Sequence, residues 1–139
     1  MNNEEIMTGV ELEIILKAGK ILLSSGAEIS RTEDTMNYIA RAMNFKDLEA
    51  YVSNRGIFAT AKKADGTEIT RICNVPEVDI NLSKIESVNA LSRRITQKNI
   101  TIEEIESELN QIDTMSDYSF FWRLVAYTLG APGFSYAIG

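Results

Sequence analysis

The first hydrophobic pattern along the chain has helical spacing. Between Glu4 and Ser25, apolar residues recur every three or four positions, at Val10, Ile14, Ala18, Ile21 and Leu22. This spacing predicts an amphipathic helix over that segment. Gly26 follows directly, at the position where a glycine commonly ends a helix in the left-handed conformation.

The next segment begins with a helix-start signal. Ser30 and Glu33 have the spacing of a capping box, in which the side chain of each residue accepts a hydrogen bond from the backbone N–H of the other. Apolar residues then return at helical spacing, which predicts a second helix from Arg31 to about Met43. A tight corner at residues 26–29 joins the two helices, so we expect them to pack as a hairpin.

After the second helix the period changes from helical to alternating. Three short runs alternate apolar and polar residues, around residues 48–53, 57–62 and 68–75. Turn residues separate them, Asn54-Arg55-Gly56 first and then Asp65-Gly66, which is a signal for a type I′ turn. These runs predict a three-stranded antiparallel meander that ends at Pro76.

The helical period then returns twice. One apolar stripe begins at Asn81 and predicts a third helix, along Leu82, Ile85, Val88, Leu91 and Ile95. A capping box at Thr101 and Glu104 begins a fourth helix. The predicted fold class is therefore α+β: two N-terminal helices, a three-stranded antiparallel meander, and two to three further helices, the last leading into an apolar segment.

That last segment differs in composition from the rest of the chain. Residues 118–122 are Tyr-Ser-Phe-Phe-Trp, and residues 124–139 carry no charge. A helix over residues 124–139 is roughly 24 Å long, whereas a spanning helix needs about 20 residues. The residues alone leave three alternatives: a buried terminal helix, an interfacial segment, or the beginning of a transmembrane helix cut off at Gly139. We divide the chain into a domain at 1–117 and this aromatic and apolar segment at 118–139.

Composition and charge exclude several classes of function. The 139 residues suit one globular domain, and the net charge of −6 makes nucleic acid an unexpected partner because like charges repel. There is no histidine, which excludes catalytic dyads and triads built on imidazole and nearly all zinc catalysis. The single cysteine, Cys73, excludes an intrachain disulfide. The first residues lack the basic leader of a signal peptide, and together these features favour a cytosolic setting.

Few residues suggest chemistry. The densest polar group is the corner at residues 24–33, where Arg31 and the free N–H groups of a helix start make a small anion site, unless the polar residues only cap the helix. Arg71, Lys62 and Lys63 lie near the second hairpin, where we expect them to pair with Glu68 or Glu49 on the open face of the sheet. Cys73 is expected to be a small buried hydrophobic residue. The acidic run at 101–117 is expected to be a solvated helix face. No catalytic residue, metal or cofactor is expected.

The order and spacing of several short motifs resemble the threonine/serine exporter family. The opening motif is Leu22-Leu23-Ser24-Ser25-Gly26-Ala27, followed by Arg31-Thr32-Glu33 and Met36. Further matching pieces are Thr70-Arg71-Ile72, the run from Val78 to Ile85, and Leu91-Ser92-Arg93-Arg94. The resemblance extends from about Met7 to Gly139.

The resemblance implies a function and a place in the cell. The family's region of this kind is a hydrophilic N-terminal domain on the cytoplasmic side of the cell membrane, followed by transmembrane helices that export small hydroxy amino acids, or in a related branch dicarboxylates, in exchange for protons. Segment 118–139 would then lead into the first of those helices. The implied partners are the membrane, the transmembrane half, a small amino acid or carboxylate, and further copies of the chain. The implied substrate-binding or regulatory residues are Ser25, Gly26, Glu28, Arg31, Glu33, Arg71 and Asn81.

Two other functions stay open at this point. The chain would be a free-standing self-associating module if residues 118–136 form a dimer interface. It would be a hydrolase-like domain if Ser24 or Ser25 reacts with help from carboxylates, although the sequence offers no base aimed at either serine.

Overall fold

The computed structural model describes residues 3–115. The elements follow in the order α1 (Asn3–Ser24), α2 (Ile29–Ala42), β1 (Phe45–Val52), β2 (Gly56–Lys63), β3 (Glu68–Asn74), α3 (Leu82–Thr96) and α4 (Ile102–Asp113). The predicted α+β class and its order of elements are confirmed. Segment 118–139 lies outside the described residues, and the division of the chain at residue 117 stays a prediction.

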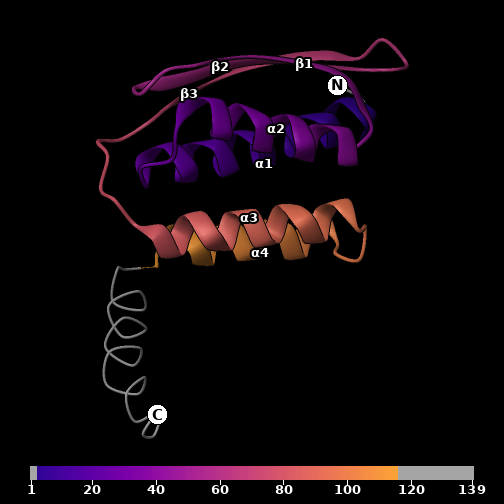
Figure 1. Ribbon diagram of the computed structural model, residues 1–139. Coiled ribbons are helices and arrows are strands. Elements are labelled where there is room, and N and C mark those ends of the chain that lie inside the picture. The colour runs from indigo at the N-terminus through magenta and orange to yellow at the C-terminus, as the bar shows by residue number, and fades with distance from the viewer. Residues whose placement is uncertain (1–2, 116–139) are drawn as a thin grey trace, which may run out of the picture.

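The elements form three layers (Figure 1). The sheet covers one side of the α1–α2 hairpin, and the α3–α4 hairpin covers the other side. Helix α1 is the centre of the molecule because it contacts β2, β3, α2, α3 and α4. Its sequence suits that place, since buried residues lie on more than one side of it. The largest fully buried side chains come from all three layers: Leu12, Ile15, Leu16, Ile21, Leu22, Met36, Ile39, Ile57, Val88, Ile105 and Leu109.

The sheet is the predicted meander, in the order β1-β2-β3 with antiparallel pairing throughout. Its inner face places Ile57, Ala59 and Ala61 against the helices. Its outer face carries an exposed apolar row, because Tyr51 lies opposite Phe58 and Phe58 lies opposite Ile72. The rings of Tyr51 and Phe58 meet edge to face, with centroids 6.4 Å apart. The predicted alternation of apolar and polar residues therefore matches the burial along β1 and β2.

The second hairpin is present, but its turn is not of type I′. That type needs a positive φ at both central residues, and here Gly66 has one (φ 96°) while Asp65 does not. The N–H of Gly66 donates to the carbonyl of Lys63 at 3.1 Å, and the N–H of Lys63 donates to the carbonyl of Thr67 at 2.8 Å. This is a three-residue loop closed by a left-handed glycine, an arrangement common in hairpins.

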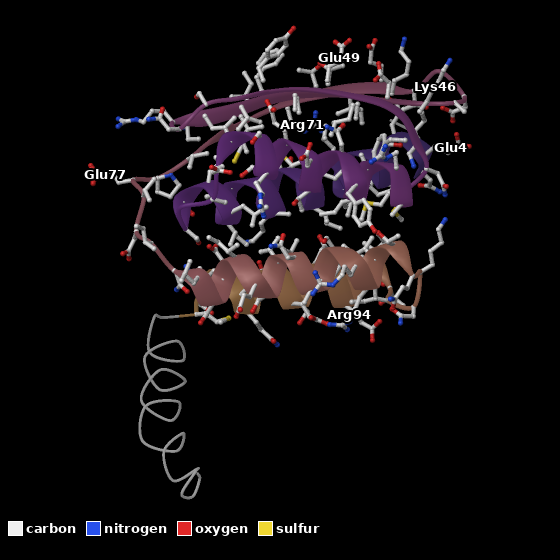
Figure 2. All side chains as sticks on the ribbon, in the orientation of Figure 1. Glu4, Lys46, Glu49, Arg71, Glu77 and Arg94 are labelled. Atoms are coloured by element: carbon white, nitrogen blue, oxygen red, sulfur yellow. The ribbon has the colours of Figure 1, made fainter. Side chains whose placement is uncertain are left out.

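Lys62 lies opposite Glu68 on the neighbouring strand, but Lys63 and Arg71 do not pair across strands as predicted. The Nζ of Lys63 lies 2.8 Å from Oε1 of Glu11, and the Nε of Arg71 lies 3.3 Å from Oε2 of Glu13. Both acids belong to α1, so both cations face the helix layer and not the open face of the sheet. Figure 2 shows Arg71 on the helix side of the sheet, with Glu49 on the opposite face. The prediction was wrong for these two residues because it did not include acidic partners from α1, which packs beneath the sheet.

At the starts of α2, α3 and α4, one prediction is confirmed and two are wrong. Thr101 and Glu104 form the predicted capping box at the start of α4. Helix α2 begins at Ile29 with Glu28 as its N-cap residue, so the predicted box at Ser30 and Glu33 is wrong. Leu82, predicted to belong to the buried stripe of α3, is exposed.

Candidate functional site: a cleft at the corner of α1 and α2

The corner between the first two helices is built by a glycine. Gly26 has φ +103°, the N–H of Ala27 donates to the carbonyl of Leu22 at 2.9 Å, and the N–H of Gly26 donates to the carbonyl of Leu23 at 3.1 Å. These two bonds are those of a Schellman motif, which satisfies the last carbonyls of a helix and turns the chain. The predicted glycine cap is therefore present, and it directs the chain straight into α2.

A second segment of the chain holds this corner from behind. The N–H of Asp79 donates to the carbonyl of Ser24 at 2.8 Å, and the N–H of Asn81 donates to the carbonyl of Ser25 at 3.0 Å. Asn81 is buried, its Oδ1 accepts from the N–H of Lys84 at 3.0 Å, and its Nδ2 donates to the carbonyl of Met115 at 3.4 Å. The backbone N–H of Asn81 thus binds the corner, while its side chain joins the start of α3 to the residue that follows α4.

A cleft of about 420 Å³ opens at this corner, and we call it the corner cleft. Its walls come from the end of α1, the corner itself, the first turns of α2 and the middle of α3. The lining residues are Leu22, Gly26, Ala27, Glu28, Arg31, Asp34, Thr35, Ile85 and Asn89. The volume is within the range of about 300–1,000 Å³ that is usual for small-molecule sites.

The polar groups of the corner cleft are charged and accessible. Glu28 and Asp34 supply carboxylates, Arg31 supplies a guanidinium, and Thr35 and Asn89 supply a hydroxyl and an amide. Arg31 Nε lies 4.0 Å from Glu28 Oε1, but the two side chains are 80% and 79% exposed. Such an exposed pair contributes only about 0–1 kcal/mol. Both side chains are therefore free to bind a ligand instead of each other.

The N-terminus of α2 adds donors to the same place. Glu28 occupies the N-cap position, but its side chain makes no capping hydrogen bond within the described part of the chain. Helix N-termini attract anions because their first N–H groups lack partners in the helix. A carboxylate bound at Arg31 would lie near these donors.

The structure brings together some of the predicted site residues. Gly26, Glu28 and Arg31 line the corner cleft. Ser25 and Asn81 are buried beside it and hold the backbone in place. Their contribution is to position the corner, since neither is accessible to a ligand.

Two predicted residues lie elsewhere. Glu33 is two positions from Arg31, about 200° around the helix, and it does not line the cleft. Arg71, on β3, forms an ion pair with Glu13 of α1 and does not line the cleft. The structure therefore gives no reason to assign either residue to the same site.

The sequence-based predictions missed the three polar lining residues Asp34, Thr35 and Asn89. Asp34 and Thr35 are three and four positions after Arg31, so helical spacing places them on its face; that signal was present in the sequence. Asn89 belongs to α3, and no local pattern indicates that it lies opposite Arg31.

Other reactive groups show no arrangement for catalysis. The hydroxyl of Ser24 donates to the carbonyl of Ile21 at 3.3 Å, and Ser25 is buried, so neither hydroxyl supports the hydrolase alternative. Cys73 is half-buried and not fully buried as expected, and desolvation raises the pKa of its thiol, which favours the protonated form at neutral pH. Within residues 3–115, no group of acidic, cysteine or histidine side chains is arranged to hold a metal ion.

Comparison with known proteins identifies the family. The family model of the threonine/serine exporter, ThrE, matches residues 13–139, which is most of the chain. No curated protein and no solved structure gives a match. Among the helices of residues 3–115, none is long and apolar enough to cross a membrane. The family is described as one of exporters, which implies a transporter at the cell membrane. The corner motif, the order of the elements and the family match agree, and the chain belongs to the threonine/serine exporter family.

Proposed function

We propose that residues 3–115 form the cytosolic domain of a proton-coupled exporter, and that the corner cleft binds the exported solute before transport. The solute is a small hydroxy amino acid or a related small carboxylate. The observation that carries the proposal is that the opening motif of the family resemblance and the lining of the corner cleft share Leu22, Gly26, Ala27 and Arg31. A motif that only shaped a helix end would not need an accessible cation.

The chemistry of the corner cleft suits a small zwitterion. Arg31 offers a planar fork of donors for a carboxylate, and the N-terminus of α2 adds positive potential. Glu28 or Asp34 offers an acceptor for an ammonium group. The apolar residues Leu22 and Ile85 offer a contact for the aliphatic part of the solute.

Recognition of a hydroxyl group has a candidate as well. Thr35 and Asn89 face the cleft from α2 and α3, and each can donate and accept a hydrogen bond. A site built to bind a hydroxyl discriminates strongly against an analogue without it, because its own polar groups then lose their partner. Proton coupling is supported by the family alone, and we assign no described residue to it.

Ligand titration tests the binding proposal. L-threonine, L-serine, succinate and L-valine are titrated separately into the chain of residues 1–139, with binding followed by calorimetry and by NMR shifts of the corner amides. We expect saturable binding of threonine and serine, weaker binding of valine, and at least about tenfold loss in Arg31→Ala, the equivalent of one lost charge-assisted hydrogen bond.

The matched control is Arg41→Ala. Arg41 lies on the same helix in its last turn, and it is exposed and outside the corner cleft. It should bind threonine like the unchanged chain. Equal weakening in both variants, or no saturable binding of any hydroxy amino acid or of succinate, would contradict a solute site at the corner.

The cytosolic placement needs a separate experiment. An epitope placed before α1 in the native membrane protein should be cleaved by added protease in inside-out vesicles and protected in right-side-out vesicles. The reverse pattern would place the domain on the other side of the membrane.

A further inference from the structure

The segment between the sheet and α3 exposes an unusual amount of apolar surface. Val78, Ile80 and Leu82 are 53%, 66% and 47% exposed, three large apolar side chains within five residues. We call these three residues the exit patch. The backbone of this segment is fixed, because the N–H groups of Asp79 and Asn81 bind the carbonyls at the end of α1. These hydrogen bonds fix the backbone on which the three exposed side chains stand.

The exit patch lies where the described chain ends. Asn81 is inside the same segment, and its Nδ2 donates to the carbonyl of Met115. The hydroxyl of Ser87 contacts Sδ of Met115 at 3.8 Å. Figure 1 shows the end of α4 beside the beginning of α3, at the end of the molecule where the connection from the sheet arrives.

The residues that follow have the composition to cover this patch. Residues 118–122 are Tyr-Ser-Phe-Phe-Trp, and residue 118 is three positions after Met115, within about 10 Å of extended chain. Exposed apolar groups that lie this close gain free energy when they remove each other from water.

Charge favours the same occupant. Glu77 and Asp79 alternate with the residues of the exit patch, and within residues 3–115 no basic group lies within ion-pair distance of either carboxylate. Figure 2 shows Glu77 projecting outward from this connection. Arg123 is the only charged residue after Asp117. Two acids beside the patch attract this arginine, and they repel an anionic lipid surface.

From these observations we infer that the aromatic stretch at residues 118–122 packs on the exit patch of its own chain. The domain is then fixed to the segment that follows it by a packed contact and not only by a flexible linker. Asn81 lies in the sequence between Ile80 and Leu82 of the exit patch, and its N–H binds the carbonyl of Ser25 at the corner. The proposed contact is therefore next to the hydrogen bonds that hold the corner. This inference stands apart from the proposed solute site, and its experiment uses no solute.

The chain carries its own reporter for this contact. Trp122 is the only tryptophan, so fluorescence excited at a wavelength that tyrosine does not absorb reports on the aromatic stretch alone. We expect emission at short wavelength and weak quenching by acrylamide in the unchanged chain. In Ile80→Asp the emission should shift to longer wavelength, toward that of the chain unfolded in urea, and the quenching should increase. Val78→Asp is a second variant with the same expected shift.

The matched control is Ile72→Asp. Ile72 is 70% exposed against 66% for Ile80, but it lies on the outer face of the sheet. It should leave the emission of Trp122 unchanged, and far-ultraviolet circular dichroism should confirm that all variants fold.

Three outcomes would overturn the inference. Emission that is unaffected by both patch variants would show that residues 118–122 do not contact the exit patch. A short-wavelength emission that is lost on dilution would assign the contact to a second copy of the chain. An emission that becomes short-wavelength only with phosphatidylcholine vesicles would assign the burial of Trp122 to the bilayer.

Discussion

Gly26 is the residue on which the geometry of the corner depends most. Its φ of +103° is outside the conformations that a residue with a side chain adopts easily, and a Cβ placed there would lie 3.2 Å from Cγ1 of Ile80. The backbone of Ile80 cannot retreat freely, because the hydrogen bonds of Asp79 and Asn81 hold it on both sides. We expect Gly26→Ala to lower the free energy of unfolding by about 2 kcal/mol, measured by urea denaturation.

Gly66→Ala separates the two causes of that loss. Gly66 has a similar φ of +96°, but a Cβ placed there would have no neighbour within 4 Å. It should therefore cost only the conformational strain, about 1 kcal/mol. Equal losses in the two variants would show that the close approach of Ile80 contributes nothing to the stability of the corner.

At the residue scale, local spacing predicted part of the site. It predicted the glycine cap, because a helix end has a local signature in the sequence, and it placed Arg31 at the corner. It misplaced the start of α2, since Ser30 and Glu33 have the right spacing but Glu28 takes the N-cap position. Thr32 explains the difference, because it is buried and both its N–H and its hydroxyl donate to the carbonyl of Glu28. Packing of Thr32 in the core outweighs a local cap.

One well-shielded ion pair joins the sheet to α1. The side chains of Lys63 and Glu11 are 20% and 14% exposed, with 2.8 Å between Nζ and Oε1. The Nζ of Lys63 also donates to the carbonyl of Met43 at 2.8 Å and lies 4.4 Å from the ring centroid of Phe45. We expect Lys63→Met to lower the free energy of unfolding by about 2–3 kcal/mol, because it leaves Glu11 shielded from water without a cation. Urea denaturation measures the loss.

Two further variants test the cause. Adding Glu11→Gln to Lys63→Met should restore part of the stability, because the double variant no longer has an unpaired carboxylate at this shielded position. Arg71→Met breaks the more exposed pair with Glu13 and should cost at most about 1 kcal/mol. If Lys63→Met costs no more than Arg71→Met, burial does not strengthen the pair with Glu11.

The capping box of α4 predicts a dependence on pH. The backbone N–H of Thr101 donates to the carboxylate of Glu104 at 2.9 Å and lowers the pKa of Glu104 below its ordinary value of 4.5. A lowered folded-state pKa means that the stabilisation is complete above about pH 4.5 and is lost as the pH falls through the folded value. Glu104→Gln should therefore lose less stability than the unchanged chain between pH 5 and pH 3, measured by urea denaturation at each pH. Identical pH profiles would show that the box contributes nothing through its charge.

At the scale of the whole molecule, the sequence predicted the elements better than their arrangement. Hydrophobic periodicity is local, so it indicated two helices, three strands and two to three further helices in order. It did not indicate that α1 lies between the sheet and the α3–α4 hairpin, and that arrangement decides the partners of Lys63 and Arg71. It also gave no sign that Asn89 closes the corner cleft from α3. Contacts between distant segments depend on packing, which a single sequence does not reveal.

The last prediction concerns export by the native membrane protein. A solute bound at the proposed site would lie against Gly26. The preceding residue, Ser25, accepts a hydrogen bond from the N–H of Asn81, whose side chain donates to the carbonyl of Met115 at the end of the described residues. A change at the cleft can therefore reach the following segment through hydrogen bonds, without a large rearrangement of the core. We expect Arg31→Ala to reduce export of threonine from loaded cells by about tenfold at low internal threonine. High internal threonine should restore the rate if the cleft only captures solute, because a weakened site then fills again. Arg41→Ala, on the same helix outside the cleft, should export normally at both concentrations.

An unchanged rate in Arg31→Ala at low threonine would remove the corner cleft from the export path. A loss of export that high threonine does not restore would assign Arg31 to coupling rather than to capture of the solute.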